Sequence, residues 1–97
     1  MIVNRRVFHT RTGKMQETIA HLQAGLKDLP YPYRIYGSFT GRFNTVVMEL
    51  EFEDLAQMQE AETARDANPA TLDWMAHWRT LVHSDGINEI WTLAEKR

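Results

Sequence analysis

The chain has 97 residues, of which 43% are hydrophobic and 25% charged, so it is long enough for one compact domain and too short for two. Thirteen acidic residues against eleven lysines and arginines give a formal net charge of −2, which argues against binding to nucleic acid or to an anionic membrane. The absence of cysteine excludes disulfides, thiolate metal sites and cysteine nucleophiles.

Neither a membrane span nor a secretory signal is predicted. The apolar runs fall well short of the roughly 20 residues that cross a bilayer, and the opening MIVNRRVF lacks the apolar segment of a signal peptide. We therefore expect one cytoplasmic domain over residues 1–97, with no membrane and no nucleic acid among its partners.

The first part of the chain predicts a strand and then a helix. Residues 2–10 are rich in β-branched and aromatic side chains, which is typical of a strand. Apolar residues then recur at every third or fourth position, as on one face of a helix: Met15, Ile19, Leu22, Leu26 and Leu29. This helix should end before Pro30, and His21, about 120° from the apolar stripe, should face solvent.

Two further strands are predicted to form a hairpin. Residues 33–39 and 45–52 have strand composition, and Gly41-Arg42-Phe43-Asn44 lies between them as a turn. In the second of these strands, alternation predicts one apolar face, made up of Val46, Met48, Leu50 and Phe52. The opposite face carries Glu49 and Glu51.

The next part predicts a helix that is interrupted. Asp54 suits an N-cap, with Leu55 and Met58 turned inward. Asn68-Pro69 should interrupt this helix and restart it, because asparagine caps helices and proline suits the first helical position. Gly86 should end the restarted helix in a left-handed conformation.

A final strand over residues 87–93 completes the order strand, helix, strand, strand, helix, strand. This order predicts an α+β, ferredoxin-like βαββαβ fold: a four-stranded antiparallel sheet with the helices on one face. Because Arg5 and Arg6 point to opposite faces of the first strand, one of them must share a face with Glu49 and Glu51. Those glutamates would repel phosphate, so a homodimer explains the uncovered face better than RNA does.

The tryptophans allow two interpretations. Trp74 and Trp78 lie one turn apart and widen the apolar surface of the restarted helix. They either contact a partner subunit or fill the core of a small domain, and the same choice applies to Trp91.

Short motifs along nearly the whole chain carry a resemblance to a known family. They are Arg6-Val7-Phe8, Gly13-Lys14, Gly41-Arg42-Phe43-Asn44-Thr45-Val46-Val47, Phe52-Glu53-Asp54-Leu55, Asn68-Pro69, Trp74 and Leu81-Val82-His83-Ser84. In this order they resemble the NIPSNAP-like family of the dimeric α/β barrel superfamily.

The resemblance implies protomers whose sheets pack face to face, so that the polar face becomes a cavity lining. It also implies that Arg6 occupies the family's arginine position and that Phe8 stands where a tyrosine is often found. Many members have histidine and tryptophan where this chain has Met48 and Leu50, so an acid or base that the family might use there is missing.

Few residues suggest chemistry. The histidines, His9, His21, His77 and His83, show no metal-binding spacing, and neither a nucleophile elbow nor a phosphate loop occurs. We therefore expect no metal and no cofactor. Only His9 and Glu49 are candidates for a catalytic acid or base, and each also has a structural explanation, as a residue at a strand end and as a partner in a cross-strand ion pair.

The candidate ligand-binding residues are Asn4, Arg6, Phe8, Tyr36 and Trp78. In one hypothesis they hold a small apolar or aromatic molecule in the barrel cavity of a homodimer, without any reaction. In another, which follows the resemblance to cofactor-independent monooxygenases and isomerases of the same superfamily, Glu49 or His9 moves a proton. A third hypothesis is that the protein is a stress-responsive or haem-handling relative. The sequence leaves open whether the protein is an enzyme.

Overall fold

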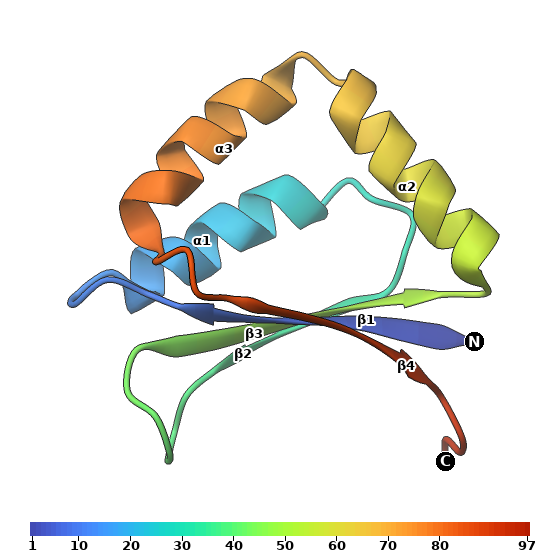
Figure 1. Cartoon of the computed structure of the whole chain (residues 1–97), viewed down its shortest axis with the longest axis horizontal. Coiled ribbons are helices and arrows are strands. Elements are labelled where there is room, and N and C mark those ends of the chain that lie inside the picture. The colour runs from blue at the N-terminus through green and yellow to red at the C-terminus, as the bar shows by residue number, and fades with distance from the viewer.

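The computed structural model describes residues 1–97 as four strands and three helices. The strands are β1 (Ile2–His9), β2 (Tyr33–Gly37), β3 (Thr45–Phe52) and β4 (Ile87–Thr92), and the helices are α1 (Met15–Leu26), α2 (Leu55–Ala67) and α3 (Ala70–Leu81). The sheet is antiparallel in the order β2-β3-β1-β4, and all three helices lie on one side of it (Figure 1). The ferredoxin-like α+β fold is confirmed, with its second helix divided into α2 and α3.

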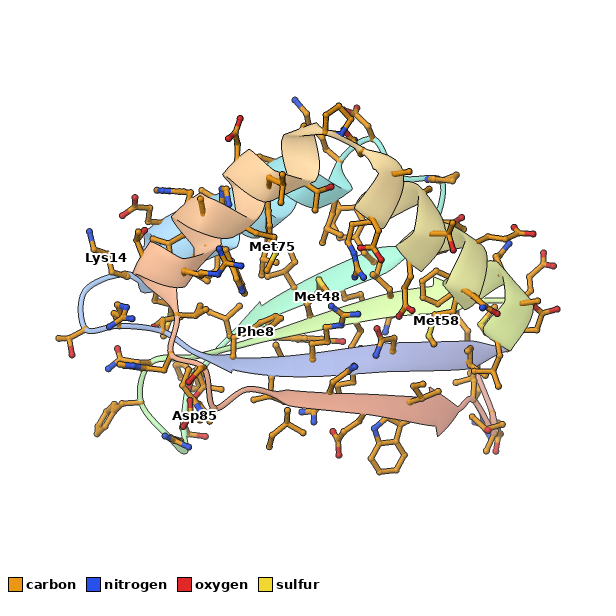
Figure 2. The ribbon with its side chains drawn as sticks, turned by 45° about the horizontal axis from the view of Figure 1, so that its top comes forward. Phe8, Lys14, Met48, Met58, Met75 and Asp85 are labelled. Carbon is orange, nitrogen blue, oxygen red and sulfur yellow. The ribbon has the colours of Figure 1, made fainter.

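The core lies between the sheet and the helices. The alternation predicted for β3 is confirmed, because Val46, Met48, Leu50 and Phe52 are all buried. Figure 2 shows Met48 between the sheet and the helices, on the same side of the sheet as Phe8. The rest of the buried apolar core comes from the helices and the segment after α3: Leu22, Leu26, Trp78, Leu81 and Val82. None of the helices combines the length and the apolar character needed to cross a bilayer.

The ends of α1 and β2 fall short of their predicted positions. Helix α1 stops at Leu26, and Leu29 is exposed in the following turn, where its amide donates to the Leu26 carbonyl. Strand β2 ends at Gly37, and Phe39 lies exposed in the hairpin loop. In both places an apolar residue extended the sequence pattern beyond the last residue that packs against the core.

The N-cap predicted for α2 is present. The Asp54 carboxylate accepts a hydrogen bond from the Gln57 amide at 2.8 Å, and the Gln57 side chain accepts one from the Glu53 amide at 2.8 Å. Met58 packs against the core as predicted, but Leu55 is 57% exposed, so its predicted inward position is wrong. Leu55 is the first residue of α2, and its side chain faces solvent, whereas Met58, one turn later, reaches the core.

The link between α2 and α3 follows the prediction, whereas the end of α3 does not. Asn68 accepts a hydrogen bond from the Ala70 amide at 3.0 Å, and Pro69 precedes the first turn of α3. The helix ends at Leu81, and Gly86 lies beyond it without a left-handed backbone. A Cβ at Gly86 would lie 3.0 Å from the Val7 carbonyl oxygen, so this glycine permits close approach to β1 instead.

The register of the sheet decides which side chains face the helices. Residues directly opposite one another in an antiparallel pair point to the same side. Asn4, Arg6 and Phe8 pair with Leu50, Met48 and Val46, so these three side chains of β1 face the helices. Arg5 pairs with Glu49 on the other side, which we call the open face, and it is therefore the arginine that shares a face with the glutamates.

Candidate functional site

A cleft opens between β1, the facing sides of α2 and α3, and the segment that joins α3 to β4. Its volume is about 850 Å³, within the range of small-molecule sites. Arg6 and Phe8 contribute from β1, Trp78 from α3 and Asp85 from the joining segment. Figure 2 shows Phe8 above β1 and Asp85 on the segment that leads into β4. We refer to this feature as the helix-side cleft.

Arg6 is the most buried charged group of the helix-side cleft. Its Nε donates to Asn4 Oδ1 at 3.1 Å, and its Nη2 lies 3.8 Å from Glu62 Oε1, beyond hydrogen-bond reach. Burial lowers the pKa of Arg6, the nearby positive charge of Arg65 lowers it further, and Glu62 only partly opposes both effects. The positive charge of the Arg6 guanidinium is therefore only weakly balanced by the protein groups around it.

Asn4 positions Arg6 and does not itself line the cleft. It is 2% exposed, and its Nδ2 donates to Asn88 Oδ1 at 2.6 Å and to the Glu89 carbonyl at 2.9 Å. These two bonds to β4 leave Asn4 Oδ1 directed at Arg6 Nε. The predicted residues Asn4 and Arg6 thus lie together, with Asn4 as a support.

Aromatic rings form the apolar wall of the cleft. The rings of Phe8 and Trp78 meet edge to face with centroids 4.7 Å apart, and Trp78 stacks on Trp74 at 5.0 Å. Trp78 is 7% exposed within the single chain, which favours the core interpretation of this tryptophan. Phe8 and Trp78, predicted as ligand contacts, both lie beside Arg6 along the cleft.

The cleft carries more positive than negative side chains. Its lining includes four arginines and two carboxylates: Arg6, Arg11, Arg65 and Arg79 against Glu62 and Asp85. Neither Arg11 nor Arg79 has a carboxylate within 4.0 Å, and the Arg11 side chain donates a single hydrogen bond, to the Arg79 carbonyl at 3.4 Å. An anion would therefore meet an attractive field here although the whole chain is slightly acidic.

His9 is held at the edge of this region. It is 7% exposed, and its Nδ1 lies 3.0 Å from Asp85 Oδ1, a contact without hydrogen-bond geometry. Contact with His9 lowers the pKa of the Asp85 carboxyl, and Arg42 at 3.5 Å contributes to the shift. Asp85 lines the cleft, but His9 does not, so this imidazole lies one residue away from it.

Neither a protein-family model nor a curated protein matches this chain. Solved structures do match it. An uncharacterized NIPSNAP domain protein from Burkholderia xenovorans superimposes with a TM-score of 0.84 at 18% sequence identity, over 97% of this chain and 95% of the other. A NIPSNAP family protein from Agrobacterium tumefaciens gives a TM-score of 0.73 at 19% identity, over 94% and 90% of the two chains. This chain has the NIPSNAP-domain fold.

The NIPSNAP-domain fold is shared with an oxygenase. A mutant of SnoaB, a cofactor-independent oxygenase from Streptomyces nogalater, superimposes with a TM-score of 0.70 at 14% identity, over 98% of this chain and 94% of the other. The ferredoxin-like protomer fold that the resemblance implied from the sequence is therefore confirmed.

Two predicted site residues lie away from the cleft in this NIPSNAP-domain fold. Tyr36 and Glu49 are on the open face, where the Tyr36 hydroxyl donates to Glu49 Oε1 at 2.9 Å. Arg5 lies 3.8 Å from the same carboxylate. The sheet separates Tyr36 and Glu49 from Arg6, so the predicted residues do not form a single site. No group of three or more histidine, aspartate or glutamate side chains that could hold a metal is present.

Sequence analysis missed most of the charged lining. Glu62 and Arg65 face the cleft because they continue the stripe of Met58 and Ala61, the residues of α2 that pack against the core. That spacing of three and four residues is visible in the sequence. No sequence pattern marked Arg11 or Arg79 as cleft residues. Arg11 lies in the turn after β1 and Arg79 on an exposed flank of α3, and the two come together only in the folded chain.

Proposed function

We propose that this NIPSNAP-like protein is a homodimer in which each protomer binds a small apolar or aromatic molecule in the helix-side cleft. The observation that carries the proposal is the half-buried Arg6 guanidinium beside the aromatic wall of Phe8 and Trp78, at a cleft of about 850 Å³. Small-molecule sites commonly combine an apolar lining with a few fixed polar groups. The proposal keeps the cytoplasmic location that we expect from the sequence.

The open face supports the homodimer. Tyr36, Val47, Val7 and Ile87 lie in one row across its four strands, and Trp91 adds an exposed indole beyond them. Ile87 and Trp91 are 51% and 55% exposed in the single chain, and no helix covers this side (Figure 1). A contiguous apolar strip of this kind is typical of an interaction surface.

Charges beside this strip suit a second copy of the same surface. Arg34, Glu49, Arg5 and Glu89 alternate in sign along the neighbouring row. In a two-fold interface the same patch meets itself, so an alternating row can place each arginine opposite a glutamate of the other subunit. Tyr36 and Glu49 would then act at the subunit contact instead of at the ligand.

A second candidate function is a cofactor-independent monooxygenase or isomerase. It is favoured by the contact between His9 and Asp85, in which a carboxylate on the cleft wall holds an imidazole, and SnoaB, which shares the fold, is named as a cofactor-independent oxygenase. Such a reaction needs a base within reach of the substrate, so a proton would pass to His9 through Asp85, the member of this pair that lines the cleft. Turnover of a cleft ligand that is lost in His9→Phe, while binding is kept, would favour this enzyme function over binding alone.

Native mass spectrometry of freshly purified protein tests the proposed function. We expect a dimer that carries additional mass from a co-purified small molecule. Arg6→Met should lose that mass, whereas Lys27→Met, which removes an exposed charge at the end of α1, should retain it. A monomer free of bound mass, or an adduct that persists in Arg6→Met, would contradict the proposed function.

A further inference from the structure

The charge of the cleft ligand can be inferred from the arginines that surround it. A guanidinium presents five N–H donors, and it is always ionised in proteins. Arg6 makes one hydrogen bond, from Nε to Asn4, and its nearest carboxylate oxygen is 3.8 Å away. Its Nη1 has no hydrogen-bond partner within the protein, so most of its donors are free toward the cleft.

The neighbours of Arg6 increase its need for an anion. Arg65 stands close enough to lower the pKa of Arg6, and its own carboxylate partner is the exposed Asp66 beside it in sequence, at 3.1 Å. Glu62 is the only acidic group that offsets Arg6. Two positive groups and one negative group therefore lie near one another in the lining of the cleft.

Glu62 also occupies the place that a ligand carboxylate would take. It approaches Arg6 from α2, a helix without a single fully buried residue. Breaking a contact of 3.8 Å loses little, because an ion pair of this length with partly exposed groups is weak. A carboxylate at hydrogen-bond distance from the same guanidinium would bind it in the bidentate manner that arginine favours.

We propose that the ligand of the helix-side cleft is an aromatic carboxylate, whose ring lies against Phe8 and Trp78 and whose anionic group binds Arg6 in place of Glu62. This inference rests on the proposed function, since it specifies the chemistry of the molecule that the cleft holds. Arg65 and Arg79 strengthen the field that attracts the anion.

Titration calorimetry with two matched probes tests the charge. The probes are 2-naphthoate and 2-naphthamide, which share one ring system and differ in charge. We expect 2-naphthoate to bind at least about tenfold more tightly, because hydrogen bonds to a charged group are roughly twice as strong as neutral ones. Its affinity should also fall as salt is raised.

Two glutamates of α2 provide the decisive variants. Glu62→Gln removes the internal competitor for Arg6 and should tighten 2-naphthoate binding by roughly fivefold. Glu60→Gln removes the same charge from the exposed side of the same helix and should leave the affinity unchanged. A gain of affinity cannot arise from misfolding, so this pair remains informative even if Arg6→Met proves unstable.

The outcomes separate this inference from the proposed function. Equal affinity for the acid and the amide, or weaker binding of the acid to Glu62→Gln, overturns the anionic ligand and leaves an aromatic-binding cleft in place. Failure of both probes to bind also overturns the inference, and the native mass spectrum then decides the proposed function by itself.

Discussion

His21 and Trp74 exchange hydrogen bonds between α1 and α3. Trp74 Nε1 donates to the His21 carbonyl at 3.1 Å, while His21 Nε2 lies 2.9 Å from the Trp74 carbonyl and the two rings stack at 4.4 Å. Because a carbonyl oxygen only accepts, His21 Nε2 must carry a hydrogen. The predicted solvent exposure of His21 is therefore wrong: α3 covers this flank of α1, which the apolar stripe of α1 alone did not reveal.

Gly25 makes this close approach of the two helices sterically feasible. A Cβ at position 25 would lie 2.7 Å from Trp74 Nε1, closer than any relaxed contact. Gly25→Ala gains about 1 kcal/mol of helix propensity, but it displaces the indole, with an overpacking cost of about 1 to 3 kcal/mol and the loss of a hydrogen bond of about 1 kcal/mol. We expect a net loss of roughly 1 to 3 kcal/mol in the free energy of unfolding, measured by urea denaturation. Gln23→Ala, at an exposed position of the same helix, should not lose stability.

Trp78 should stabilise the protomer itself. It is 7% exposed and contacts Phe8 and Trp74, so Trp78→Ala should cost about 3 to 5 kcal/mol through the cavity it leaves. Leu72→Ala on the same helix removes a side chain that is 78% exposed and should stay within about 0.5 kcal/mol of wild type. Similar losses for both variants in denaturant titrations would show that Trp78 is not part of the core.

Asp85 should make stability depend on pH in the acid range. Its pKa in the folded chain is depressed below the ordinary value of 3.8 by contact with His9 and by Arg42. The contact therefore contributes stability above about pH 3.8, and that contribution is lost as pH falls through the lower folded pKa. The difference in free energy of unfolding between wild type and Asp85→Asn should be constant near pH 5 and shrink toward pH 2. Asp28→Asn controls for the loss of one exposed negative charge, and a difference that grows toward acid pH would refute the assignment.

Trp91 should govern the association of protomers. It lies on the open face and is 55% exposed in the single chain, so Trp91→Glu would place a charge in the proposed interface. We expect the dimer dissociation constant to rise at least about tenfold, measured by sedimentation equilibrium. Leu72→Glu introduces the same charge on the helical side and should leave association unchanged. Equal dimer dissociation constants for Trp91→Glu and wild type would show that the open face is not the dimer interface.

Local patterns in the chain predicted much of the architecture. Alternation in β3 gave its buried face, and Asp54 with Gln57 marked the start of α2, because both signals depend on residues a few positions apart. Gly86 shows the limit of such reasoning. Its role is to let the backbone approach Val7, a residue of another strand, and no local turn pattern carries that information.

The sequence by itself determined the order of elements and the apolar side of β3, because periodicity fixes which residues share a face, and the family resemblance made Arg6 and Phe8 candidates. Only the tertiary structure decided what each face meets. Strand register placed Arg6 toward the helices, Tyr36 and Glu49 on the opposite side of the sheet, and the arginines of separate segments around one cleft. These relations depend on contacts between residues far apart in the chain, which a pattern confined to neighbouring residues does not encode.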